Sequence, residues 1–354
     1  MDSIWWNRVP NARSLVDVVV NKLLNDTTVL LQYNNPIPWK DSFVNRIKDG
    51  VREKSASKSF ATIAGVTDPG KYLLNEYCKA AKRATYRPSK GFAPFFAESD
   101  DIVLHEYYFW VEIETNESLD AWHKFVSDYA NARGKGKSVA VFVLDCHGLQ
   151  VKHKRKGIEN VDVDRLINEY DKRIFSTLIS GVINEKSYLK AYLTELLINI
   201  VGPDIELLSA VMSNYNAFLN DPKEALLEIS ANNTRSDGTQ YSVDKELPEV
   251  EHGTWKAQIK TIYPLVEEYR QAFVNRHSKA IITNCLPVEN SAGEIIRDPQ
   301  ELELGTLVYL ADIKKLVLQG DEYDRLVCFK DARNILSHLG VLTLTEVEQL
   351  FRMY

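Results

Sequence analysis

Residues 138–145 read SVAVFVLD, a nearly continuous apolar run that ends in an acid. A run of this length is typical of a strand buried on both faces, as in a parallel sheet. Comparable runs precede it at 27–33 (TTVLLQY), 59–64 (SFATIA) and 103–113 (VLHEYYFWVEI). We therefore predict an α/β domain over residues 1–160, with at least four parallel strands in a three-layer arrangement between helices.

Amphipathic segments connect these predicted strands. Their apolar residues recur every three or four positions, which is the spacing of one helix face. Helices are predicted at 11–24, with Asn11 as the N-cap, and at 39–51, 72–81 and 119–132. Strands that alternate with helices in this way favour parallel pairing through crossover connections.

The rest of the chain has a helical pattern. Strand-like runs disappear from Asp162 onwards, and we predict a helical connector or lid over 161–230. Residues 231–250 are rich in turn-forming types and are predicted to be a linker. A compact α-helical bundle is predicted over 251–354. Its helices are expected at 255–282, 302–318, 323–339 and 346–353, the last opened by a capping box of Thr343 and Glu346.

Composition argues against several classes of protein. The chain has 354 residues and a net charge of −6, so no overall charge draws it to DNA or to an anionic membrane. Its 4 cysteines form no CxxC pair, which argues against a disulfide framework and favours a cytoplasmic location. The histidines show no HExxH spacing, so we predict no metal site and no cofactor. No apolar run approaches the roughly 20 residues that cross a bilayer, and no membrane insertion is expected.

A parallel sheet raises the question of nucleotide binding. A phosphate-binding loop would follow the first strand, where glycines expose backbone N–H groups. The sequence there, 34–39 (NNPIPW), has no glycine and has two prolines, which lack an N–H group. A GKS triplet at 136–138 precedes a strand instead of following one, and Asn131 stands where the first glycine of such a loop belongs.

The layout of residues 27–229, a sheet domain and then a helical lid, nonetheless resembles a degenerate member of the AAA or STAND class of P-loop ATPases. The resemblance is architectural, and it implies a P-loop-like fold kept after loss of the Walker A loop. Glu112, Glu114 and Asp145 end predicted strands, where such enzymes hold magnesium, but solvated strand ends are the favoured explanation. We therefore do not expect a competent P-loop ATPase.

One dense basic run follows the strand that ends at Asp145. It contains Lys152, Lys154, Arg155 and Lys156 and is flanked by glycines. Clustered cations can hold a phosphate backbone, so these four residues are predicted as a nucleic-acid-binding segment, as in a DNA-associated regulator. A solvated loop is the alternative, because no aromatic side chain is interleaved for base stacking.

The most specific short motif is RNILSH, at residues 333–338. An arginine, a polar residue, three further residues and a histidine resemble the signature of the HEPN superfamily of small α-helical bundles. In active relatives this motif cleaves RNA without metal, usually with two copies meeting across a dimer interface. The resemblance implies Arg333, Asn334 and His338 as catalytic residues, RNA as a substrate and a homodimer as the assembly.

These residue types suit RNA cleavage by the 2′-hydroxyl. His338 can accept and donate a proton near neutral pH, Arg333 can hold the developing phosphate charge, and Asn334 can orient phosphate or ribose. At about 100° per residue, Asn334 and His338 share a helix face. Arg333 lies about 140° from His338, so the three converge only beside a groove or a second subunit.

A structural role for this motif is the alternative. His338 stands two residues before Gly340, where a cation meets the negative end of the helix dipole, and Arg333 can pair with Asp331 or Glu322. Two functions are therefore predicted. The first is a component of a prokaryotic antiviral defence or toxin system, with an RNA-cleaving HEPN-like bundle and an N-terminal domain for sensing or partner binding. The second is a non-catalytic scaffold or adaptor, a pseudo-ATPase, that binds other proteins of a defence complex.

Overall fold

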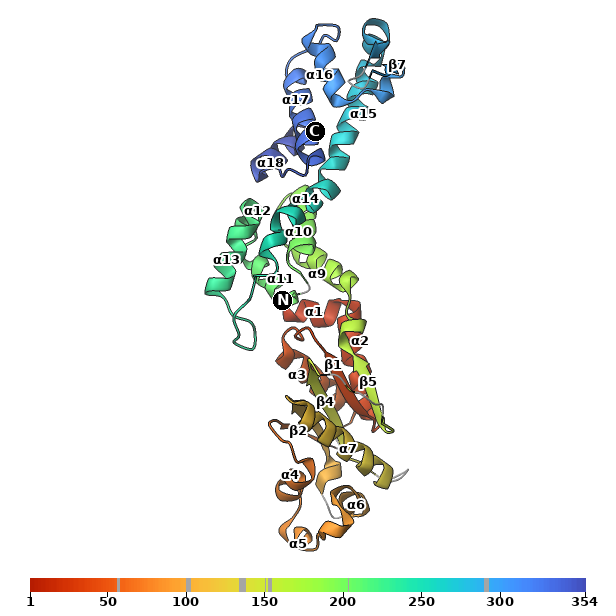
Figure 1. Cartoon of the computed structure of the whole chain (residues 1–354), viewed down its shortest axis with the longest axis vertical. Coiled ribbons are helices and arrows are strands. Elements are labelled where there is room, and N and C mark those ends of the chain that lie inside the picture. Colours follow the sequence, from red (N-terminus) through yellow and green to blue (C-terminus); the bar gives the residue numbers. More distant parts are fainter. Residues whose placement is uncertain are drawn as a thin grey trace. The chain divides into compact units, whose positions relative to one another are not determined.

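The computed structural model describes residues 1–55, 58–99, 103–133, 138–149, 151, 155–202, 204–289 and 293–354. The chain forms two compact units. The first comprises Met1–Phe175 and Pro203–Glu206, and the second comprises Ser176–Gly202 and Leu207–Tyr354 (Figure 1). The large sheet belongs to the first unit, whereas the described part of the second is mainly helical.

A five-stranded parallel sheet of order β2-β3-β4-β1-β5 lies at the centre of the first unit's described residues. Its strands are β1 Thr28–Tyr33, β2 Ser59–Ile63, β3 Tyr107–Ile113, β4 Val141–His147 and β5 Ile158–Asp162. The middle strand, β4, is buried along all but its last residue, as its apolar sequence requires. The predicted α/β class is thereby confirmed.

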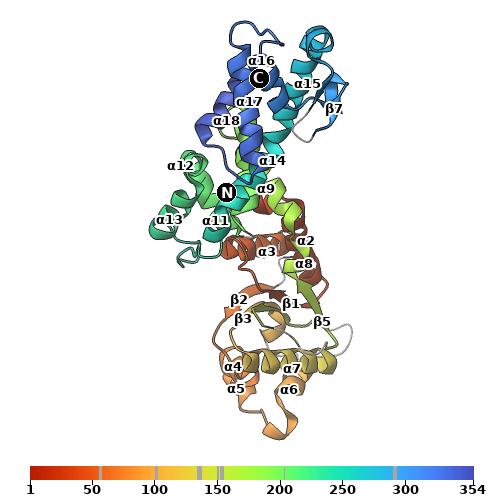
Figure 2. The same ribbon diagram turned by 45° about the horizontal axis from the view of Figure 1, so that its top comes forward.

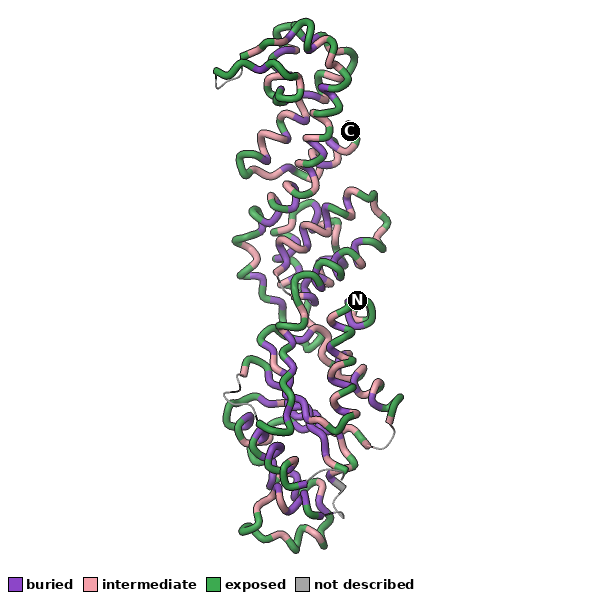
Figure 3. Tube along the Cα trace, turned by 90° about the vertical axis from the view of Figure 1, so that its right-hand side faces the viewer, coloured by how far each residue is buried: buried purple, intermediate pink, exposed green. Residues whose placement is uncertain are grey.

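Helices cover both faces of this sheet (Figure 2), and buried residues follow its strands (Figure 3). On one face, Phe43 of α3 stacks on Trp6 and meets Trp110 of β3 edge to face. On the other, Trp122 of α7 packs against Phe142 of β4. The helices of this unit are α1 Asp2–Arg8, α2 Pro10–Leu24, α3 Lys40–Lys54, α4 Pro69–Glu76, α5 Ala80–Arg83, α6 Phe92–Glu98, α7 Asn116–Arg133 and α8 Val163–Leu166.

The described residues of the second unit form helices and one short antiparallel pair of strands, β6 Val288–Glu289 and β7 Ile295–Ile296. Helices α9 Glu169–Gly181 and α11 Ile205–Ser213 begin in the first unit and continue into the second. The others are α10 Ser187–Ile200, α12 Tyr215–Asn220, α13 Pro222–Asn232, α14 Val250–Thr261, α15 Tyr263–Ala280, α16 Leu304–Asp312, α17 Glu322–Ser337 and α18 Leu344–Met353.

Helices α10 and α14 pack closely within the second unit. A Cβ atom at Gly253 of α14 would come within 2.7 Å of the Asn199 carbonyl oxygen of α10, so only glycine fits there without movement. The buried Gln258 donates to the Tyr192 hydroxyl at 2.9 Å and exchanges two hydrogen bonds with the Leu342 backbone, at 2.7 and 2.8 Å. α10, from the predicted connector, and α14, from the predicted bundle, thus belong to one compact unit.

Several predicted helix boundaries were wrong. The helix predicted at 72–81 is interrupted between α4 and α5, and the one predicted at 302–318 ends at Asp312 of α16. The helix predicted at 255–282 is divided into α14 and α15, because Pro264 lacks an N–H group and restricts the residue before it. Helix α2 begins at Pro10, with Val9 rather than Asn11 at its N-cap. Proline suits the first turn of a helix because an N–H group there has no partner within the helix.

The observed strands differ from the prediction in two places. The strand predicted at 103–113 begins only at Tyr107, because the residues before it form a 3-10 turn. Strand β5 was not predicted at all. Only Ile158 and Val161 of its five residues are buried, so it lacks the apolar run that marks the other strands.

Candidate functional site

The RNILSH motif lies at the end of α17. Arg333 and Asn334 belong to the helix, whereas His338 is the C-cap residue, with φ −102° and ψ 25°. The chain then turns sharply through Leu339 at φ 61°, and a Cβ at Gly340 would come within 2.9 Å of the Ile335 side chain. The His338 N–H still donates to the Asn334 carbonyl oxygen at 3.2 Å, so His338 closes the last turn of α17 although its own φ and ψ are no longer helical.

The motif residues differ in exposure, since Arg333 and Asn334 are half-buried. Arg333 donates to the Glu303 carboxylate at 3.3 Å and to the Asn334 side-chain oxygen at 3.4 Å. The His338 side chain is exposed. The structure thus holds Arg333 against a carboxylate of its own chain and beside Asn334, while the His338 side chain is open to solvent at the end of α17.

The predicted basic segment is described only in part. Lys152 and Lys154, and with them Lys137 of the GKS triplet, lie outside the described residues. Arg155 and Lys156 are exposed. The charge of Arg155 adds to the effect of burial in lowering the pKa of the His123 imidazole, so the guanidinium lies near α7.

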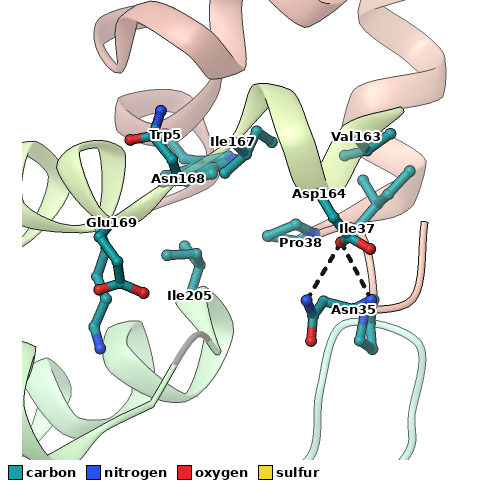
Figure 4. Close-up of a pocket in the computed structure, with 12 residues that line it drawn as sticks. Trp5, Asn35, Ile37, Pro38, Val163, Asp164, Ile167, Asn168, Glu169 and Ile205 are labelled. Atoms are coloured by element: carbon teal, nitrogen blue, oxygen red, sulfur yellow. Dashed lines mark hydrogen bonds between the residues drawn. The ribbon is translucent and has the colours of Figure 1, made fainter. Parts of the chain in front are cut away.

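The loop from β1 to α3 occupies the position where a P-loop protein binds phosphate, and Asp164 of α8 binds its first amides. The Asp164 carboxylate accepts from the backbone N–H of Asn34 at 2.7 Å and of Asn35 at 3.4 Å. It also accepts from the side-chain amides of the same two residues, at 2.9 and 3.3 Å. Figure 4 shows the two bonds from Asn35. Both oxygens of the Asp164 carboxylate therefore accept hydrogen bonds from the first two residues of this loop.

The end of the same loop is bound by a second carboxylate. Trp39, the N-cap residue of α3, has a left-handed backbone with φ 47°, and its N–H donates to Glu206 Oε1 at 2.6 Å. The Glu206 side chain is buried, and it lies at the positive end of the α3 dipole, where an anion is stabilised. The two prolines of the loop have no N–H to offer a ligand.

Asp145, near the end of β4, forms a buried cluster beside this loop. Lys40, the first residue of α3, places its ammonium 2.7 Å from one carboxylate oxygen. The Trp110 indole N–H donates to that same oxygen at 2.9 Å, and the Tyr33 hydroxyl donates to the other oxygen at 2.6 Å. Burial, together with the Asp145 charge, raises the pKa of the Tyr33 hydroxyl above its usual value.

A cavity of about 330 Å³ opens between the loop and the segment that follows β5 (Figure 4). Its walls are mainly apolar, and polar groups of the Asn35 and Asp164 pair and of Glu169 reach it. It lies beyond the carboxyl ends of β1 and β5, the usual position of a ligand in an open α/β sheet. Sequence reasoning named neither Asp164 nor Glu206, because their partners are 130 and 167 residues away.

Comparison with known proteins does not place the chain: no family model matches it, and no curated protein matches it. Among the described residues, no three His, Cys, Asp or Glu side chains gather in a way that would hold a metal ion. Within the same part of the chain, no helix has both the length and the apolar composition needed to cross a membrane.

Proposed function

We propose that the chain is a non-catalytic adaptor, a pseudo-ATPase, that binds other proteins of a prokaryotic defence or toxin complex in the cytoplasm. The observation that carries this proposal is that Asp164 and Glu206 bind the amides of the loop from β1 to α3. A nucleotide phosphate at this loop would have to displace both carboxylates and then lie beside them, against like-charge repulsion.

The Asp145 cluster supports the same function. An acid at a strand end would have to offer a free oxygen to magnesium, yet both Asp145 oxygens already accept hydrogen bonds or an ion pair. Lys40, at the start of α3, contacts this acid, although a lysine at such a position in a P-loop protein would hold phosphate. The first unit would therefore provide a binding surface for partner proteins instead of a nucleotide site.

Nucleotide binding tests this proposal directly. We expect titration calorimetry with ATP and Mg²⁺ to give no saturable binding, and phosphate release to stay at background. The double variant Asp164→Asn, Glu206→Gln, which removes two negative charges and keeps two acceptor oxygens, should bind ATP no worse than the wild type. Saturable ATP binding by the wild type that is lost in Lys40→Ala would overturn the proposal.

A metal-independent ribonuclease assembled from two copies is the second candidate. It is favoured by the resemblance of residues 333–338 to the HEPN motif and by the accessibility of Arg333, Asn334 and His338 at the end of α17. A second copy would have to release Arg333 from Glu303 and bring a phosphate to His338.

Cleavage of a mixed tRNA and mRNA pool in EDTA tests this second candidate. Activity should be lost in Arg333→Ala and in His338→Ala, and light scattering should show a dimer. His252→Ala, at another exposed histidine of the same unit, is the matched control and should keep full activity. Cleavage that is unchanged in both motif variants would exclude these residues as the catalytic centre.

A further inference from the structure

A groove of about 410 Å³ runs along α17 where α18 packs beside it. Two rows of α17 side chains line it at four-residue spacing, with Asp324, Cys328 and Ala332 in one row and Val327, Asp331 and Ile335 in the other. The two rows cover three helical turns, or about 17 Å of helix length. Leu342 and Leu350 close the floor from the other side.

The floor of this groove is apolar, and its edge is acidic. Asp324, Asp331 and Glu346 line it, and no lysine or arginine is among its described lining residues. Lys330 pairs with Asp331 at 2.8 Å, whereas Asp324 makes no ion pair within the described part of the chain. Val327 and Ile335 stay partly exposed although they are aliphatic.

We propose that this groove, between α17 and α18, binds a basic amphipathic helix of a partner protein. Aliphatic side chains at positions i, i+3 or i+4, and i+7 of that helix would fill the floor between Val327 and Ile335. Its lysines or arginines would face the three carboxylates, and this charge complementarity selects a basic partner over an acidic one. The proposal deepens the adaptor function and rests on it.

Cys328 provides a readout that is specific to the groove. The other cysteines, Cys78, Cys146 and Cys285, are buried, with exposed fractions of 6%, 0% and 1%. A maleimide dye should therefore label native protein at Cys328, and Cys328→Ser should abolish that labelling. Burial and the nearby Asp331 and Glu346 raise the pKa of the Cys328 thiol, so labelling is best measured above pH 8.

The probe is a synthetic helical peptide of about 18 residues with leucines at the spacing given above and lysines elsewhere. We expect a saturating concentration of this peptide to slow Cys328 labelling about tenfold. A peptide with glutamates in place of every lysine should leave the labelling rate unchanged. Failure of the lysine peptide to protect Cys328 would overturn the proposal.

Charge reversal separates the groove from general attraction to an acidic protein. Asp324→Lys, Asp331→Lys should bind the lysine peptide about tenfold more weakly by fluorescence anisotropy. Glu228→Lys, Glu301→Lys carries the same change in net charge at exposed positions outside the groove and should bind as the wild type does. Circular dichroism checks that both variants are folded.

Equal peptide affinity in the two double variants would reject the groove as the binding site. Protection of Cys328 that rises with protein concentration in the absence of peptide would assign the groove to a second copy of the chain and overturn the partner helix. The ATP experiment tests the first unit alone, whereas the groove lies in the second. Failure of the groove proposal can therefore be told apart from failure of the proposed function.

Discussion

Asp145 places a carboxylate in the interior of the first unit, where Lys40, Tyr33 and Trp110 all contact it. Asp145→Ala leaves an ammonium group, a hydroxyl and an indole N–H without their acceptor, so we expect the free energy of unfolding to fall by roughly 3–5 kcal/mol. Asp145→Asn keeps one acceptor oxygen and should lose roughly 1–3 kcal/mol. Urea titration followed by tryptophan fluorescence measures both. A loss below about 1 kcal/mol in Asp145→Ala would mean that the cluster contributes little to stability.

Tyr192 gives the second unit a pH dependence. Burial raises the pKa of Tyr192 to about 12, although the hydrogen bond with Gln258 acts in the opposite direction. Because the unfolded chain ionises first, near pH 10, the stabilisation is fully present below that pH and is lost as the pH rises towards 12. Between these values, unfolding free energy should fall more steeply with pH in the wild type than in Tyr192→Phe, by up to about 1.4 kcal/mol per pH unit. Parallel pH profiles for the two proteins would contradict the assignment of this pH dependence to Tyr192.

At the scale of the element, the crossing of α10 and α14 depends on Gly253. Alanine is the better helix former, by about 1 kcal/mol, but here its Cβ would lie 2.7 Å from the Asn199 carbonyl oxygen and 2.8 Å from the Ile200 side chain. We expect Gly253→Ala to lower the free energy of unfolding by about 1–3 kcal/mol. Gly305→Ala in α16, where a Cβ would meet nothing within 4 Å, is the matched control and should not destabilise. Thermal unfolding followed by circular dichroism compares the two.

Elements with a strong local pattern were predictable from the sequence. The apolar runs that became β1 and β4 and the capping box of Thr343 and Glu346 are confirmed, because burial on both faces and local hydrogen bonds leave a mark in neighbouring residues. β5 is an edge strand with an exposed face, and its pairing with β1 is set by residues about 130 positions away. That information is absent from any short window of sequence.

For the candidate site, the sequence predicted a missing feature and none of the residues that take its place. The absence of glycine and the two prolines at 34–39 indicated that the phosphate loop is missing, but not what replaces it. Asp164 and Glu206 stand in segments that read as ordinary helix starts, and only folding brings them to the amides of Asn34 and Trp39. A carboxylate at a helix start is common, so its distant partner leaves no signal in composition or spacing.

At the scale of the whole molecule, the chain passes between the two units more than once. The chain leaves the first unit after Phe175, returns for Pro203–Glu206 and leaves again at Leu207. Glu206, in the returning segment, is held by the Trp39 amide. The short return therefore contributes to the first unit through this half-buried hydrogen bond and through the buried side chain of Ile205.

Each unit has its own buried core, so we expect two unfolding transitions instead of one. The sequence provides separate probes, because five of the 6 tryptophans lie in the first unit and only Trp255 lies in the second. Fluorescence should follow mainly the first unit, and far-ultraviolet circular dichroism should follow the helices of both. Asp145→Ala should lower the midpoint of the transition that dominates the fluorescence. Gly253→Ala should lower the midpoint of the other transition, which circular dichroism reports and to which only Trp255 contributes fluorescence. A single transition that both substitutions shift equally would show that α9 and α11, which continue from one unit into the other, couple the two cores into one cooperative body.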